Sequence, residues 1–467
     1  KIAPPSTSAI TYGLVLLAAA IIPMAWSIAS KRLSWPISMC FVLLAGTYLL
    51  SPRPPAHPTQ LTTYAMIYNR ESYVLLASLL VCLFVDRREP GRFSNFVDGS
   101  QAGLLLVLLL YCKITYFAAG FGLALLSVLL YTKSRQWFAA AATAFLSVAL
   151  GIFLFFHISL FAYLGNVMEA GRAQSVHLRT QLLAAGARHD VKFICLLFFC
   201  LAAMTWAQGR ASAKPLPTVR LWLASVAIVA AALFIISGNG AQHGGADDPL
   251  YFVVAIICIE NFRRANQAEI ERPRSAARVV HALSVVLSVP LFCAPLVARD
   301  AESFAYTVKW DLEARPALTE TQRFHIAPLR DFYVPPSTDH ITGYWPARLY
   351  PANINDGIDL LRRHLETGDR VAVFGFANPF SYALGLPPAK DGNLWWDIYF
   401  DFDRKHHPTP DAYLGDAALV IAPTLTPDAP PDSVEINGVL TEIYGSYLHS
   451  HFHVVESTAI WTLYRRN

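Results

Sequence analysis

Long runs of apolar residues fill most of the first 297 positions and constrain the fold more than any other feature. A helix needs about 20 apolar residues to cross the hydrocarbon core of a bilayer, although about 17 suffice. Closed barrels apart, only a helix satisfies its own backbone hydrogen bonds in lipid. The runs therefore predict a polytopic α-helical membrane protein with about ten spans. The spans are expected near residues 9–30, 36–50, 64–85, 101–112, 114–131, 137–161, 192–208, 220–237, 249–261 and 278–297.

The remainder of the chain has a different composition. Only 15% of the 467 residues are charged, against about 25% in a soluble domain, but residues 298–467 are rich in Asp, Pro, Tyr and Trp. This contrast predicts two domains, a transmembrane helical domain (1–297) and a soluble α/β domain (298–467). A net charge of +4 leaves no basic surface of the kind that binds nucleic acid, so no nucleic-acid partner is expected.

Lys and Arg are distributed unevenly between the two sets of alternate loops. One set, which includes Arg32, Arg87, Lys133 and Arg263, holds more than twice as many basic residues as the other. Because basic loops remain in the cytoplasm, the richer set is expected there. Ten spans then place the C-terminal domain outside the cytoplasm. The predicted location is the bacterial inner membrane, with a periplasmic C-terminal domain.

The run 101–131 decides this orientation, because basic loops flank it on both sides. A single tilted span would place those two loops on opposite faces of the membrane. Two short helices that meet near Lys113 at the outer face keep both loops inside. We therefore expect a helical hairpin that turns at Lys113.

Apolar periodicity predicts a small sheet in the C-terminal domain. Residues 354–368 are expected to form a helix, and strands are expected at 370–376, 417–423, 452–455 and 460–464. Trp395 and Trp396 lie in a polar loop, where exposed rings either stack on sugars or pack on the membrane surface. His449, His451 and His453 alternate, so on a strand they share one face, as metal ligands or as a plain polar surface.

Polar residues gather at two predicted outer positions. Tyr68, Asn69 and Arg70 open the third span, where Arg70 either pairs with Glu71 at the interface or faces a cavity and binds an anionic head group. Lys113, close to Tyr116, either extends toward the lipid head groups or points into a site.

The outer loop 162–192 holds an excess of basic residues that runs against the orientation rule. Arginine matches the oxygen geometry of phosphate, so phosphate binding is one explanation. The other is an amphipathic helix, at 167–186, that lies on the membrane surface. The basic residues concerned are Arg172, Arg179, Arg188 and Lys192.

A glycine-rich outer loop precedes the span at 249–261 and ends in two carboxylates, Asp247 and Asp248. Carboxylates are favoured at a helix start by the helix dipole, so helix capping is one explanation of the pair. The alternative is a metal ligand pair or a base beside a sugar site, with His243 of the same loop. Asp190 is a further candidate carboxylate.

These features resemble those of the bacterial GT-C superfamily of membrane glycosyltransferases, a group similar in plan to protein O-mannosyltransferases and aminoarabinose transferases. The resemblance rests on the layout of helices, outer loops and terminal domain, and on short motifs. The motifs are Tyr68-Asn69-Arg70, Lys113-Ile114-Thr115-Tyr116, Asn378-Pro379-Phe380, Trp395-Trp396 and His407-Pro408.

The resemblance implies transfer of a sugar from a polyprenyl-phosphate-linked donor to a glycan, lipid or protein acceptor at the periplasmic face, with membrane lipid as the surroundings. It implies that cations bind the donor phosphate, here Arg70, Lys113, Arg172, Arg179, Arg188 and Lys192. Substrate contacts are expected from Tyr68, Asn69, Tyr116 and His243. A carboxylate acts as base or, in some members, holds a divalent cation (Mg or Mn), and the candidates are Asp247, Asp248 and Asp190.

The chain departs from the superfamily at one point. The principal Asp of that group usually lies in the first outer loop, but residues 1–8 and 51–63 contain no acid. We therefore expect the first span and its Asp to precede Lys1. The main alternative function is a non-catalytic membrane subunit or scaffold that docks a partner through its periplasmic domain. A polymerase or ligase of lipid-linked glycans fits the terminal domain less well, and the absence of an internal repeat argues against a transporter.

Overall fold

The computed structural model describes residues 7–50, 64–89, 91, 93–131, 133–174, 176–209, 215–239, 249–267, 294–309, 312–313, 316–330, 332, 349–390, 396–424 and 431–467. The chain divides into two compact units. The helical unit comprises Leu14–Leu160 and Arg179–Tyr306, and the sheet unit comprises Lys1–Gly13, Phe161–Leu178 and Thr307–Asn467.

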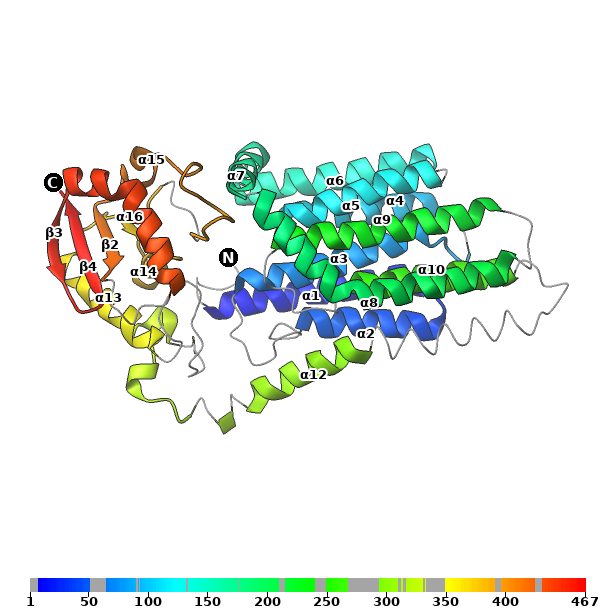
Figure 1. Ribbon diagram of the computed structural model, residues 1–467, viewed down its shortest axis with the longest axis horizontal. Coiled ribbons are helices and arrows are strands. Elements are labelled where there is room, and N and C mark those ends of the chain that lie inside the picture. The colour runs from blue at the N-terminus through cyan, green and yellow to red at the C-terminus, as the bar shows by residue number, and fades with distance from the viewer. Residues whose placement is uncertain are drawn as a thin grey trace. The chain divides into compact units, whose positions relative to one another are not determined.

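Helices that lie side by side build the helical unit (Figure 1). The helices of the first 309 residues are α1 (Thr7–Ser30), α2 (Trp35–Leu50), α3 (Tyr64–Phe84), α4 (Ser94–Cys112), α5 (Ile114–Leu130), α6 (Arg135–Phe156), α7 (Leu160–Ala173), α8 (Val176–Gly209), α9 (Pro215–Asn239), α10 (Pro249–Gln267) and α12 (Ala294–Lys309). The domain boundary predicted at residue 297 lies within α12, and the compact units divide at Tyr306.

Four helices of the described residues are long and apolar enough to cross a membrane. They are Tyr12–Ser30, Ser94–Cys112, Arg135–Phe156 and Thr218–Gly238. A fifth span results if Leu178–Arg188 and Asp190–Trp206, which meet at an angle of 58°, form one broken span. The chain thus has the character of a membrane protein. The count of about ten spans stays a prediction, and most of the expected last span, 278–297, lies outside the described residues.

The centre of the helical unit is occupied by α3 and α10. Every residue from Asn69, in α3, to Val85, directly after α3, is buried, and so is every residue of α10 from Leu250 to Glu260. A helix that is apolar on all sides needs neighbours on all sides, and α3 contacts α2, α4, α5 and α10.

The predicted hairpin is present, because α4 and α5 are separate helices that break at Lys113. The Lys113 backbone is extended (φ −159°, ψ 118°), and its N–H still donates to the carbonyl of Leu109. At the other end of the hairpin, Lys133 Nζ donates to the carbonyl of Leu83 over 3.3 Å. The basic loops on both sides of the hairpin therefore lie at the same end of the unit.

Small residues bring α4 and α6 into close contact. A Cβ at Gly99 would meet the backbone of Trp137, and one at Gly103 would meet the backbone of Ala141. Glycines spaced by four residues allow two membrane helices to approach this closely. Their contact fixes α6 beside the hairpin.

The stretch 167–186, predicted as one amphipathic helix, is divided in the structure. α7 ends at Ala173 and α8 begins at Val176. Exposed apolar side chains, among them Phe161 and Met168, are present on α7. The two halves of the predicted helix belong to different compact units, which separate at Leu178.

The sheet unit holds a four-stranded mixed sheet with strand order β1-β2-β4-β3. All four predicted strands are confirmed: β1 (Val371–Val373), β2 (Leu419–Pro423), β3 (Phe452–Ser457) and β4 (Trp461–Arg466). β1 and β2 are parallel, and the other two pairs are antiparallel. The unit also contains the short helices η4 (Glu320–Gln322) and η5 (Ala327–Leu329), and α13 (Tyr350–His364), α14 (Pro379–Leu384), α15 (Pro410–Leu414) and α16 (Pro431–His451).

Two expectations about side chains of this unit are wrong. His449 and His451 lie at the end of α16, and only His453 lies on a strand, so the three do not share a strand face. Trp396 is 2% exposed and packs edge-on against Phe402 at 4.9 Å between ring centroids, so its ring is not offered to a sugar. Trp395 lies outside the described residues.

Candidate functional site

Four consecutive polar residues near the start of α3, Asn69 to Ser72, are buried in the helical unit. Arg70 is 5% exposed and Glu71 is 7% exposed. A charged side chain within a membrane is costly and as a rule faces the bundle interior, where it marks function. We call these four residues, together with Asp300 and Ser303 of α12, the Arg70 cluster.

The Arg70 guanidinium has partners from three elements. It interacts electrostatically with Tyr48 of α2, with Asp300 of α12 and with the adjacent Glu71. Both carboxylates therefore act electrostatically on one guanidinium. The Arg70 side chain is buried in the helical unit, and its two predicted roles, pairing with Glu71 or binding an anionic head group, both stay predictions.

A row of tyrosines lies on the same side of α3, since Tyr73 follows Arg70 by three residues. The Tyr73 ring packs edge-on against Tyr48 at 6.0 Å and against Tyr116 at 4.9 Å between centroids. Tyr116 of α5 is fully buried. The row joins α2, α3 and α5 next to the guanidinium.

Lys113, at the turn of the hairpin, lies with its Nζ 4.8 Å from the centroid of the Tyr68 ring. A cation over an aromatic face is attracted by the ring quadrupole. Because Tyr68 is two residues before Arg70 on α3, this contact brings a second cation to the same end of the helical unit. The structure therefore groups five of the predicted residues: Tyr68, Asn69, Arg70, Lys113 and Tyr116.

The helix α12 buries two polar side chains. Asp300 is 3% exposed and Ser303 is fully buried, whereas Phe304 is 60% exposed. Glu302 and Lys309 are exposed on the same helix. Buried polar groups in a membrane protein suit an interior site.

An open apolar groove of about 710 Å³ runs between α2 and α12, with Trp26 of α1 in its wall. Its volume falls within the range of about 300–1,000 Å³ that is typical of ligand pockets. Asp300 is the charged residue in the lining. The lining residues are Trp26, Met39, Val42, Leu43, Gly46, Thr47, Leu50, Val297, Asp300, Ala301 and Phe304.

Asp190, the described member of the three candidate catalytic carboxylates, is buried on α8. The hydroxyl of Tyr251, at the start of α10, donates to its Oδ2 over 2.8 Å. Near the end of α9, a Cβ at Gly238 would lie 3.3 Å from Thr115 Cγ2, which brings the end of α9 to the turn of the hairpin. α10 follows α9 in the chain, and Tyr251 is near the start of α10. The hydrogen bond from Tyr251 therefore holds Asp190 near the same end.

The other predicted phosphate-binding cations are not part of this cluster. Arg179, Arg188 and Lys192 are exposed on α8, and Arg188 Nε donates to the carbonyl of Ala184 on its own helix. Arg172 is exposed on α7 and belongs to the sheet unit. Asp247, Asp248 and His243 lie outside the described residues.

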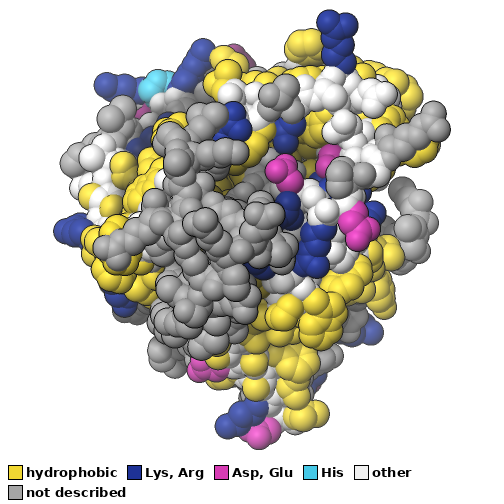
Figure 2. Space-filling model, turned by 90° about the vertical axis from the view of Figure 1, so that its right-hand side faces the viewer, with side chains coloured by type: hydrophobic (Ala, Val, Ile, Leu, Met, Phe, Trp, Pro, Cys, Tyr) yellow, Lys and Arg dark blue, Asp and Glu magenta, His cyan; other side chains and the backbone are white. Residues whose placement is uncertain are grey.

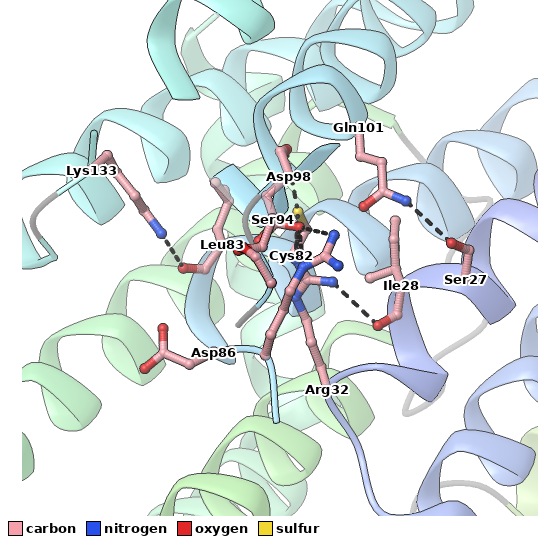
Figure 3. Close-up of polar contacts among 12 residues, drawn as sticks. Ser27, Ile28, Arg32, Cys82, Leu83, Asp86, Ser94, Asp98, Gln101 and Lys133 are labelled. Carbon is pink, nitrogen blue, oxygen red and sulfur yellow. Dashed lines mark hydrogen bonds and ion pairs between the residues drawn. The ribbon is translucent and has the colours of Figure 1, made fainter. Parts of the chain in front are cut away.

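A second buried ionic cluster, at the opposite end of the hairpin, was not foreseen as a site (Figure 3). Arg32 is fully buried, and its Nη2 lies 2.6 Å from Asp98 Oδ1. Arg87 Nε donates to the same oxygen over 2.7 Å. The sequence pattern indicates only a membrane orientation for Arg32 and Arg87. The signal for the ionic cluster is Asp98, a single acid in the first turns of an apolar helix. We call this part of the helical unit the basic end.

The same end continues through Glu260 of α10, which is fully buried. Its Oε1 accepts from the backbone N–H of Ser34 over 2.6 Å, and its Oε2 accepts from Arg263 Nε over 2.8 Å. Arg264 Nη2 donates to the carbonyl of Arg32 over 2.7 Å. Figure 2 looks onto this end, where Lys and Arg side chains gather around acidic ones. These contacts tie the loops together.

A divalent cation, which the superfamily resemblance implies for some members, does not fit the Arg70 cluster well. Its two carboxylates, Glu71 and Asp300, already interact with a guanidinium, and that positive charge opposes a metal ion there. Within the described part of the chain, no three His, Cys, Asp or Glu side chains are grouped as metal ligands.

The fold and its clusters define a helical membrane protein with a small C-terminal α/β domain. Comparison with protein families, with curated proteins and with solved structures gives no significant match.

Proposed function

We propose that this chain is a membrane glycosyltransferase of the bacterial inner membrane that moves a sugar from a polyprenyl-phosphate donor to a cell-envelope acceptor at the periplasmic face. The observation that carries the proposal is the burial of Arg70 among polar groups of α2, α3 and α12, beside an apolar groove. A charged interior site joined to an apolar groove suits a substrate with a charged head and a long hydrocarbon chain.

The charges suit the chemistry of the reaction. The leaving group in such a transfer is a lipid phosphate, so a fixed cation stabilises the transition state. Arginine binds phosphate through a planar fork of N–H donors. In this account Arg70 binds the donor phosphate, and Lys113, next to Tyr68, adds positive charge on the periplasmic side.

The groove between α2 and α12 accommodates the polyprenyl chain. Its lining is apolar except for Thr47 and Asp300, and Asp300 interacts with Arg70. In this account the hydrocarbon chain of a phosphate bound at Arg70 enters the groove past Asp300. The charged cluster and the apolar lining match the two parts of this one ligand.

Orientation follows from the basic end. Its arginines and Lys133 lie at one end of the helical unit, and basic residues of this kind remain in the cytoplasm. Lys113 and the start of α3 lie at the other end, so we assign the Arg70 cluster to the periplasmic face. The predicted ten spans also give a periplasmic C-terminal domain.

The test is transfer of radiolabelled sugar from polyprenyl-phosphate donors to cell-envelope fractions by the full chain in proteoliposomes. We expect transfer by the wild type and a loss of at least about 100-fold for Arg70→Gln, in the range of a lost transition-state charge contact. Arg135→Gln, which removes an exposed cation at the basic end, is the matched control. Thermal unfolding in detergent shows whether each variant is folded, and Arg70→Lys serves if Arg70→Gln is not.

Absence of transfer by the folded wild type across a broad donor panel would overturn the proposal. If the same preparation instead contained a stoichiometric partner bound through residues 307–467, the scaffold alternative would replace it. Equal activity of wild type and a folded Arg70→Gln would leave the enzyme but remove Arg70 from its site.

A further inference from the structure

The inward face of α12 brings a carboxylate to the one place where the Arg70 cluster meets the groove. Asp300 lines the groove and interacts electrostatically with Arg70. It is buried, and so is Ser303 one turn later on the same face. In the sequence, Asp300 follows the last predicted span and belongs to the predicted soluble domain, so the sequence alone does not indicate it for the site.

Among the described residues, the other carboxylates near this end are placed differently. Asp190 accepts a hydrogen bond from Tyr251 over 2.8 Å and lies on α8. Glu71 is buried next to Arg70 in the chain but is not in the lining of the groove. Asp300 has both properties that a base needs here: it lies beside the proposed phosphate-binding group and it borders the space that a substrate enters.

We propose that Asp300 is the general base that accepts the proton of the acceptor hydroxyl. This inference rests on the proposed function. The acceptor oxygen forms a bond to the anomeric carbon of the sugar, and the bond from that carbon to the donor phosphate oxygen breaks. The electron pair of the broken bond leaves on the lipid phosphate beside Arg70, and the hydroxyl proton moves to an Asp300 carboxylate oxygen.

The arrangement accounts for the pairing of Asp300 with Arg70. A guanidinium nearby favours the charged form of a carboxylate, and a base must be charged before it accepts a proton. After transfer, the lipid phosphate has gained negative charge next to Arg70 while Asp300 has become neutral. The negative charge that the lipid phosphate gains equals the charge that Asp300 loses, so the total charge of Arg70, Asp300 and the phosphate is unchanged by the step.

The test compares Asp300→Asn and Asp300→Glu with wild type in the proteoliposome transfer assay, with equilibrium binding of unlabelled polyprenyl phosphate measured in parallel. Loss of a general base lowers the rate by about 10²–10⁴-fold, so Asp300→Asn should lose transfer by this factor and retain lipid phosphate binding. Asp300→Glu should recover part of the rate. Glu302→Gln, exposed on the same helix, is the control.

A pH profile separates a base from a structural role. The wild-type rate should rise with pH as the base ionises, and the residual rate of Asp300→Asn should lose that rise. A folded Asp300→Asn that transfers at more than about a tenth of the wild-type rate, or that loses lipid phosphate binding in proportion to its rate, overturns the assignment. Absence of transfer by the wild type overturns the proposed function itself, so the two failures are distinguishable. If Asp300→Asn does not fold, the rate and pH profile of Asp300→Glu decide whether Asp300 is the base.

Discussion

Asp98 on α4 holds Arg32, from the turn after α1, with 2.6 Å between the carboxylate and guanidinium atoms, although Arg32 is fully buried. The same carboxylate accepts from Arg87, which follows α3. One acid therefore ties together two loops that are separated in the sequence by α2 and α3. This contact fixes the basic end at one side of the helical unit, and the assignment of the Arg70 cluster to the opposite side depends on it.

Replacement of Asp98 by Asn should destabilise the helical unit. Removal of one partner of a buried ion pair leaves an uncompensated charge and costs about 3–5 kcal/mol. The free energy of unfolding of the full chain, measured by SDS titration in mixed micelles, should fall by about this amount. Glu89→Gln is the control. Glu89 is an exposed acid in the loop between α3 and α4, so this variant should unfold like the wild type. An unchanged Asp98→Asn would show that the pair contributes no stability.

The contact between α4 and α6 gives a prediction about packing. Ala at Gly103 directs a Cβ into the backbone of Ala141, which cannot move unless the helices separate. Overpacking of this kind costs about 1–3 kcal/mol, so Gly103→Ala should lower the free energy of unfolding in the same SDS titration. At Gly122, a Cβ would meet nothing within 4 Å, and Gly122→Ala should be neutral. Equal behaviour of the two variants would contradict the close approach of α4 and α6.

The sequence predicts some features of this fold well because they depend on local patterns. The break at Lys113 follows from a cation between two apolar halves, and the strands follow from short apolar runs. His449 and His451 were misassigned because alternation resembles a strand, but α16 continues to His451, whose ring stacks on Tyr447 one turn earlier at 4.0 Å between centroids. An exposed Trp396 is predicted from its aromatic and polar loop, yet its ring packs against Tyr413 and Tyr444, which are distant in sequence.

The Arg70 cluster was predicted only in part, for a similar reason. Tyr68, Arg70 and Lys113 stand out as polar groups beside apolar runs. Asp300 does not, because its importance comes from an electrostatic interaction with Arg70, on a helix far away in the chain. Only the three-dimensional structure brings these two residues into one cluster.

In the sheet unit, Gly357 of α13 is a sensitive position. A Cβ there would lie 2.6 Å from Phe380 Cε1 and 3.0 Å from Trp461 Nε1, and that nitrogen donates to the carbonyl of Asn353 over 2.7 Å. Gly357→Ala should therefore destabilise β4 by about 1–3 kcal/mol, measured by hydrogen exchange of its amides in the full chain. Gly438→Ala, with nothing within 4 Å of its Cβ, should leave the exchange unchanged or slowed, since Ala favours the helix.

Glu456 gives the sheet unit a defined response to acid. Hydrogen bonds from Arg363 and His364 lower the pKa of this carboxyl. Arg363 Nη2 lies 2.6 Å from Glu456 Oε1, and His364 Nε2 lies 2.7 Å from Oε2. A lowered folded-state pKa stabilises the fold fully above the unfolded pKa of about 4.3, and this stabilisation is lost as the pH falls through the folded value.

The difference in local opening of β3 between wild type and Glu456→Gln should therefore be present at pH 7 and vanish in strong acid. Hydrogen exchange of the full chain, corrected for intrinsic rates, measures it. Because the pair is exposed to solvent, the difference should also shrink in high salt. A difference that persists at a pH below the folded pKa would show that the carboxylate charge is not its cause.

Photo-crosslinking with a polyprenyl phosphate that carries a photoreactive group on its chain tests the central claim most directly, namely that the Arg70 cluster and its groove bind a lipid phosphate. With the full chain in proteoliposomes, mass spectrometry should locate saturable crosslinks on α2 and α12, near Leu43 and Phe304, which line the groove. Excess unlabelled polyprenyl phosphate and Arg70→Gln should both reduce these crosslinks. Saturable crosslinks at the basic end instead, or labelling that neither treatment reduces, would contradict the account.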